Sequence, residues 1–143
     1  MTIARVLAGK KITEVFSATA DMSVQQAVAI LAANRIGALP VLDGEKLVGI
    51  FSERDLIYCA AKEGGTALDR PVREVMTANP FTATHEVSVL EALALMTQRR
   101  IRHLPVIHEG ALVGLISIGD LVKFRIDAIE AEAEAMRNYI QTA

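Results

Sequence analysis

One segment of this 143-residue chain is written twice. Residues 36–55 read IGALPVLDGEKLVGIFSERD, and residues 101–120, at an offset of 65, read IRHLPVIHEGALVGLISIGD with no insertion or deletion. The same offset relates shorter matches upstream, beginning with Phe16 and Phe81, so the repeat starts near residue 15. A duplicated unit predicts that the chain builds one structure twice and buries a face between the two copies.

Length and composition limit what such a chain can fold into. A chain of this size has room for one globular domain or two very small ones, and two units of about 60 residues would each be marginal alone. The hydrophobic fraction is 52%, yet the chain has only four Phe, two Tyr and no Trp. We therefore expect an aliphatic core, and we expect the two units to gain most of their stability by packing on each other.

Several functional classes are disfavoured by the sequence. The longest apolar run, residues 27–33, is far shorter than the roughly 20 residues that cross a bilayer, so we expect no membrane contact. The first residues lack the apolar core of a signal peptide, which favours the cytoplasm. A net charge of −2 gives no general attraction for nucleic acid.

Catalytic and metal-binding motifs are not found either. Cys59 is the only cysteine and is expected to be a packed or idle thiol. His85, His103 and His108 do not have the spacing of a zinc site. We expect no metal, no catalytic cofactor and no enzyme activity.

Within each copy, the patterns predict the order strand, helix, strand, strand, helix. The expected elements of the first copy are a strand at 15–19, a helix at 24–33, strands at 38–42 and 46–51, and a helix ending near 62. Those of the second copy are strands at 81–84, 103–107 and 111–117, and helices at 89–98 and from 119 onward. The expected organisation is an N-terminal docking segment at 1–14, a first repeat at 15–63, a linker with a short helical turn at 64–79, a second repeat at 80–125 and a C-terminal helical extension at 126–143.

The last helix is predicted to continue far past the repeat. Its apolar residues follow alternating spacings of four and three, which is the heptad pattern of a helix that packs along another helix. They are Val122, Ile126, Ile129, Ala133, Met136 and Ile140. This stripe either covers its own protomer or forms a homodimer contact. We favour the dimer, because little of the repeat's own core remains for the stripe to cover.

A serine and an aspartate three residues apart open the last helix of each copy: Ser52 with Asp55, and Ser117 with Asp120. In one interpretation, the serine caps the helix and the acid interacts with its dipole. In the other, the carboxylate faces a cleft and binds a vicinal diol such as a ribose, while the hydroxyl and backbone amides receive an anion.

Repeat length, element order and motif positions together resemble the CBS domain pair, or Bateman module, over residues 10 to about 125. The resemblance implies an α+β fold of tandem repeats packed sheet against sheet about a pseudo-twofold axis. It also implies two clefts that bind adenosine compounds: AMP first, then ATP, ADP or NAD, or S-adenosylmethionine. Asp55 and Asp120 would then hold the ribose diols, with Ser52 and Ser117 beside ribose or phosphate.

The resemblance assigns further residues to the two clefts by position. The adenine edge would meet the backbone around Gly37, Ala38 and Leu39 and around Arg102, His103 and Leu104. Pro40 and Pro105 would shape the walls, and Ser17, Thr19, Thr82 and Thr84 would line the floor. Arg54 could contact phosphate, and Gly119 would let a phosphate approach the backbone.

Each of these assignments has a structural alternative. Arg54 could instead pair with Glu53 or Asp55, Arg102 and His103 could simply edge the sheet, and the two threonines of the second copy suit a strand by propensity. The copies differ chemically, because Arg102 and His103 replace Gly37 and Ala38. We therefore expect the clefts to differ in affinity, with the Asp120 cleft binding more tightly.

The expected function is a non-catalytic, cytoplasmic, homodimeric sensor in signal transduction that binds adenosine nucleotides and regulates a partner protein. One rival is a ligand-free dimerisation module that acts on a partner. A second rival is an enzyme that uses Cys59 or His103.

Overall fold

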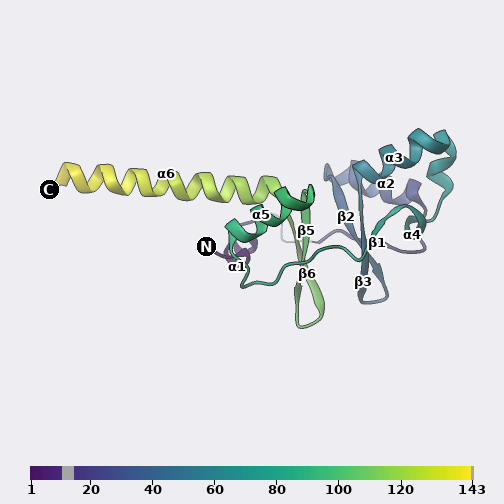
Figure 1. Cartoon of the computed structure of the whole chain (residues 1–143), viewed down its shortest axis with the longest axis horizontal. Coiled ribbons are helices and arrows are strands. Elements are labelled where there is room, and N and C mark those ends of the chain that lie inside the picture. The colour runs from purple at the N-terminus through teal and green to yellow at the C-terminus, as the bar shows by residue number, and fades with distance from the viewer. Residues whose placement is uncertain (11–14, 143) are drawn as a thin grey trace.

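Each repeat is built on one antiparallel hairpin in the computed structural model, which describes residues 1–10 and 15–142 (Figure 1). In the first repeat β2 (Ala38–Asp43) pairs with β3 (Lys46–Ser52), and in the second β5 (His103–His108) pairs with β6 (Ala111–Ser117). The registers are equivalent, with Pro40 opposite Ile50 and Pro105 opposite Leu115. The predicted duplication of the hairpin is confirmed.

The first strand of each copy is shorter than the sequence predicts. β1 (Ala18–Thr19) pairs in parallel with β2, and β4 (Thr77–Ala78), which the sequence did not predict, completes a sheet of order β1-β2-β3-β4. The prediction of a strand at 81–84 was wrong, because only Ala83 of these residues forms a β-bridge, which is parallel and joins it to Val106. Its N–H and C=O bond to the neighbouring strand, and no second pair among the described residues extends the ladder.

Three helices begin directly after a capping serine. α2 (Val24–Asn34), α3 (Glu53–Glu63) and α5 (Val89–Arg99) each start after a serine whose side chain accepts a backbone N–H three residues later. α2 and α5 end at Arg35 and Arg100, which have left-handed backbones with φ of 52° and 55°. These two arginines mark the point in each repeat where the chain turns from the helix into the hairpin.

The N-terminal segment packs into the second repeat. α1 (Ile3–Ala8) there takes the place that α4 (Val72–Val75), which follows η1 (Gly64–Asp69), takes in the first repeat. The Ile3 N–H donates to Val87 O at 2.9 Å, as the Val72 N–H donates to Met22 O at 2.8 Å. The second repeat is therefore completed by residues that precede the first. Residues 11–14 of the expected docking segment lie outside the described residues.

Two aliphatic cores result, one in each repeat. The second-repeat core includes Ile3, Leu104 and Leu121, and the first-repeat core is centred on Leu39 and Phe51, all fully buried. The two repeats meet where β3 contacts β6. This is the expected α+β architecture of tandem repeats related by a pseudo-twofold axis.

α6 (Ile118–Thr142) starts in the second repeat and extends well beyond it (Figure 1). Only Leu121 of its side chains is buried. Within residues 1–10 and 15–142, we find no helix with the length and apolarity that a membrane span requires.

Candidate functional site

Two clefts lie where the repeats meet, and each takes residues from both repeats. The Asp120 cleft has a volume of about 500 Å³ and the Asp55 cleft about 640 Å³. The Asp120 cleft is lined by Leu7, Lys10, Val15, Phe16, Asn34, Arg35, Ile36, Gly37, Ala38, His103, Val113, Gly114, Leu115, Ser117 and Asp120. The Asp55 cleft is lined by Gly37, Ile50, Ser52, Glu53, Arg54, Asp55, Ile57, Tyr58, Thr77, Ala78, Asn79, Pro80, Phe81, Arg100, Ile101, Arg102 and His103.

The two linings follow the repeat. In each cleft, the serine and aspartate at the last helix of one copy face the helix-to-strand junction of the other copy. Arg35 in the Asp120 cleft corresponds to Arg100 in the Asp55 cleft, and Phe16 corresponds to Phe81, both at the offset of 65. The clefts therefore share one plan, although their linings are not identical.

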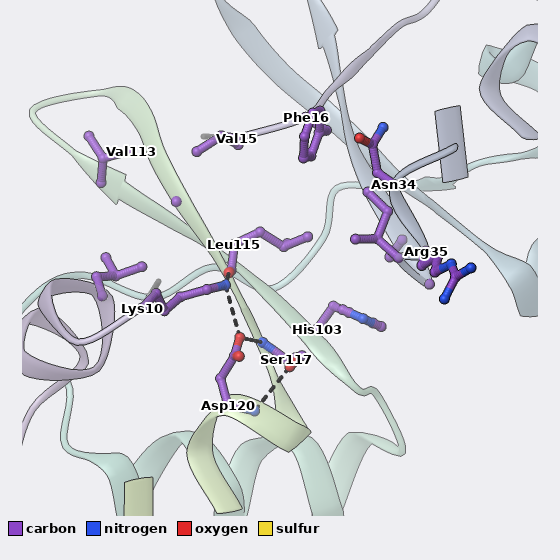
Figure 2. A pocket seen from close by; sticks show the side chains of 15 residues that line it. Lys10, Val15, Phe16, Asn34, Arg35, His103, Val113, Leu115, Ser117 and Asp120 are labelled. Atoms are coloured by element: carbon purple, nitrogen blue, oxygen red, sulfur yellow. Dashed lines mark hydrogen bonds and ion pairs between the residues drawn. The ribbon is translucent and has the colours of Figure 1, made fainter. Parts of the chain in front are cut away.

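Asp120 is held at the start of α6 by two groups (Figure 2). Its Oδ2 accepts a hydrogen bond from the Ser117 N–H at 2.9 Å and forms an ion pair with Lys10 Nζ at 3.0 Å. The Asp120 N–H in turn donates to Ser117 Oγ at 3.0 Å. Lys10 also donates to Leu115 O at 3.0 Å. Burial acts to raise the pKa of Asp120, but the Ser117 N–H and the Lys10 ammonium group stabilise the carboxylate and hold the pKa below its ordinary value.

Asp55 caps α3 as Asp120 caps α6, but its further partner is a neutral hydroxyl, that of Thr77, instead of a lysine. Its Oδ2 accepts the Ser52 N–H at 2.9 Å and the Ser52 hydroxyl at 3.1 Å. Its Oδ1 accepts the Thr77 hydroxyl at 3.1 Å, on the side of the carboxylate that faces β4. Both aspartates thus cap their helices and line a cleft at the same time, so the two interpretations of this motif are compatible.

His103 lines both clefts, as does Gly37. A Cβ placed on Gly37 would lie 3.6 Å from both His103 Cε1 and Glu53 Cδ, so these residues form the partition between the clefts. Burial lowers the pKa of His103 below its ordinary value, although Asp120 and Glu53 act to raise it. His103 is consequently a neutral imidazole near pH 7 and can both donate and accept a hydrogen bond.

The structure gathers about half of the predicted site residues at the clefts. Those that line one or both clefts are Gly37, Ala38, Ser52, Arg54, Asp55, Arg102, His103, Ser117 and Asp120. Those outside both linings are Ser17, Thr19, Leu39, Pro40, Thr82, Thr84, Leu104, Pro105 and Gly119. Leu39 and Leu104 are fully buried in the cores, and Thr19, Thr82 and Thr84 are exposed on or beside the first strands.

Arg54 does not form the ion pair that was the structural alternative for it. Its Nη1 donates to Arg100 O at 3.1 Å, and among the described residues it forms no ion pair with Glu53 or Asp55. The carbonyl that it contacts belongs to the opposite repeat. Arg54 therefore bridges the two sides of the Asp55 cleft.

Sequence reasoning missed several lining residues. Lys10 lies upstream of the repeat and has no counterpart at the offset of 65, so no repeat signal could indicate it. Phe16 with Phe81, and Arg35 with Arg100, do recur at that offset. Their duplication was a signal for a shared position in the two clefts, although it does not say which way the side chains point.

No group of His, Cys, Asp and Glu side chains in the described part of the chain could hold a metal ion. Cys59 is half-buried on α3, outside both cleft linings, and its Sγ lies 3.6 Å from Glu63 Oε2. Burial, and then the charge of Glu63, raise the pKa of the Cys59 thiol. Its thiolate is thus disfavoured at neutral pH.

Comparison with known families matches the CBS domain twice, at residues 10–62 and 72–127. The chain belongs to the CBS domain family. The CBS pair is 39% identical to a protein with CBS domains from Burkholderia ambifaria, whose solved structure superimposes with a TM-score of 0.84 over 89% of this chain and 95% of that one. The resemblance inferred from the sequence is confirmed.

A curated relative of the CBS pair is the mitochondrial CBS domain-containing protein CBSX3 of Arabidopsis thaliana. It is 35% identical over 128 residues, which cover 86% of this chain but only 62% of the relative. The chain therefore spans less than two thirds of the length of that protein.

Two solved CBS pairs contain adenosine compounds. CBSX2 in complex with AMP has 25% identity and a TM-score of 0.70, covering 80% of this chain and 89% of that one. The CBS pair of MJ0100 in complex with 5′-methylthioadenosine and S-adenosylmethionine has 25% identity and a TM-score of 0.76, covering 87% and 98%. These ligands were observed in CBSX2 and in MJ0100.

Proposed function

We propose that this CBS pair is a non-catalytic regulatory protein of the cytoplasm that binds adenosine nucleotides, AMP first, in the clefts between its repeats. The observation that carries the proposal is the duplicated cleft itself. Each cleft joins a capped aspartate of one repeat to the helix-to-strand junction of the other, in a volume within the roughly 300–1,000 Å³ typical of small-molecule sites. The adenosine complexes of CBSX2 and MJ0100 support the ligand class.

The remaining hydrogen-bonding capacity favours the Asp120 cleft. A carboxylate has about four acceptor positions, two on each oxygen. The described residues use two positions on Asp120, both on Oδ2, and three on Asp55, spread over both oxygens. A vicinal diol donates two hydrogen bonds, so Asp120 can accept both through Oδ1 while Asp55 can accept one. We therefore propose tighter binding in the Asp120 cleft.

Phosphate would be bound differently in the two clefts. At Asp120, the Ser117 hydroxyl accepts the Asp120 N–H and still has its own hydrogen to donate. The Asp55 cleft is lined by three arginines, Arg54, Arg100 and Arg102. A guanidinium group can donate two parallel hydrogen bonds to two oxygens of one phosphate. The Asp55 cleft is thereby the better site for a ligand with more than one phosphate.

A regulatory output requires that the ligand bind one arrangement of the repeats more tightly than another. Each cleft is closed by both repeats, and His103 with Gly37 forms the partition between them. A nucleotide that contacts both sides would favour one angle between the repeats. That angle is what a regulated partner protein would sense.

Isothermal titration calorimetry with AMP, ATP, NAD and S-adenosylmethionine tests the proposal. We expect saturable binding of AMP, and unchanged nucleotide after prolonged incubation. No heat from any of the four compounds would contradict adenosine binding and favour the ligand-free dimerisation module, whose supporting feature is the exposed apolar stripe of α6. Conversion of the nucleotide would favour an enzyme.

A further inference from the structure

The apolar stripe of α6 is left exposed by the chain's own body. The body covers a different stripe of the helix, in which Leu121 is buried and Ile118, Phe124 and Ala128 are half-buried. The heptad residues lie about a quarter turn around the helix from it. Val122, Ile126, Ile129, Met136 and Ile140 are 43–66% exposed, which is unusual for side chains of this kind at regular spacing.

The charges beside this stripe indicate what covers it. With Ile126, Ala133 and Ile140 at positions a, and Val122, Ile129 and Met136 at positions d, the flanking g positions include Arg125 and Glu132. The flanking e positions include Glu130 and Arg137. In a parallel two-stranded coiled coil, each g residue meets the e residue five positions later on the other helix. This places Arg125 beside the partner copy's position 130, a glutamate, and Glu132 beside position 137, an arginine.

The antiparallel alternative gives the opposite result. When the same stripe overlaps fully in antiparallel fashion, e residues meet e residues and g residues meet g residues. Glu130 would then lie opposite the glutamate at position 130 of the second copy, and Glu132 opposite the glutamate at position 132. Lys123 would lie opposite the arginine at position 137. All of these contacts are between like charges, which are unfavourable at such positions.

We propose that α6 forms a parallel two-stranded coiled coil with α6 of a second copy of this chain, through residues 122–140. The stripe is about 28 Å long, which is short for an independent coiled coil. However, the helix already forms on the body that anchors it through Leu121, so association does not require the helix to nucleate. A parallel arrangement places both CBS pairs at the same end of the coil, where a change of angle in one is felt by the other.

Sedimentation equilibrium of the full chain tests the interface first. We expect a dimer for the natural protein and a monomer for Ile129→Asp. Ile129 is 49% exposed, so this variant keeps its fold, which circular dichroism checks. A monomeric natural protein, or an Ile129→Asp variant that still dimerises, would overturn the proposal.

Charge exchange then tests the orientation. Glu132→Lys alone and Arg137→Glu alone should each raise the dimer dissociation constant roughly fivefold, since each brings like charges together twice per dimer. The double variant should recover the natural dissociation constant in a parallel dimer. In an antiparallel dimer position 137 faces Lys123, so Arg137→Glu alone would lower the dissociation constant, and the double variant would fall below the natural value instead of matching it.

A matched control is Glu134→Lys, which makes the same change of charge at position b, away from the stripe. We expect its dissociation constant to stay within about twofold of the natural value. A double variant that does not match the natural value while Glu134→Lys is silent would overturn the parallel orientation. These results are independent of nucleotide binding, so they separate the coiled coil from the proposed function.

Discussion

Lys10 and Asp120 are joined by an ion pair of 3.0 Å between Nζ and Oδ2, although 110 positions separate them. The lysine comes from the segment before the first repeat and the aspartate from the first turn of the last helix. Both side chains are less than a third exposed, at 28% and 27%. The pair therefore ties the N-terminal segment to the very carboxylate that we propose to hold a ribose.

Lys10→Gln should lower the free energy of unfolding by about 1 kcal/mol at neutral pH. The folded-state pKa of Asp120 is depressed, so its contribution is present above its ordinary pKa and is lost as the pH falls through the folded value. Urea unfolding at about pH 7 and about pH 3 measures this. The difference between the variant and the natural protein should be smaller at the lower pH. Lys46→Gln, at an exposed hairpin lysine, is the control.

Asp120→Ala should weaken AMP binding by roughly 1.5 to 3 kcal/mol, the scale for losing hydrogen bonds to a charged group. Asp55→Ala should have a smaller effect on AMP, because fewer of its acceptor positions remain for a ligand. Calorimetric titration of the two variants measures both effects, with circular dichroism to check the fold. Unchanged affinity in both variants would rule out ribose binding by the aspartates.

His103→Gln should flatten the dependence of stability on pH in weakly acidic solution. The pKa of His103 is lowered in the folded state, mainly by burial, so the unfolded chain binds a proton first as the pH falls below about 6.5. The natural protein should lose stability from there down to the folded pKa. Urea midpoints across this interval for both proteins make the comparison, with exposed His108 replaced as the control. Parallel pH curves for His103→Gln and the natural protein would contradict it.

Gly49→Ala should destabilise the protein more than Gly114→Ala, although the two glycines are equivalent in the repeat. A Cβ on Gly49 would clash with the Met76 side chain and lie 2.9 Å from the backbone oxygen of Thr77. A Cβ on Gly114 would meet only the flexible end of Leu7, at 2.7 Å. Overpacking of this kind costs about 1–3 kcal/mol. Thermal unfolding of the two variants gives the order, and equal losses would contradict it.

Ile3→Ala should lower the free energy of unfolding by about 2–5 kcal/mol, because Ile3 is fully buried in the core of the second repeat. Hydrogen exchange should show the loss of protection first in β5, β6 and α5. Val72→Ala is the matched variant, since Val72 has the same place in the first repeat. Its loss of protection should fall in β2, β3 and α2.

The hairpins, the capped helices and the pairing of Ser52 with Asp55 and Ser117 with Asp120 were all predictable from the sequence. They depend on contacts a few residues apart: turn residues, caps and alternating apolar positions are local, and duplication confirms each of them. The resemblance to the CBS pair, which the family comparison confirms, rests on the same local motifs at a repeated spacing.

Only the tertiary structure decided which residues face each aspartate. Asp120 lines a cleft together with Arg35 and Gly37 of the other repeat, and it pairs with Lys10 from a segment that no repeat signal indicates. The reason is that the second repeat is completed by residues that precede the first: Ile3, which corresponds to Val72, lies 69 residues before it instead of 65 residues after it. Local patterns specify the elements, but contacts between elements far apart in the chain depend on how the two cores close, and periodicity does not encode that closure.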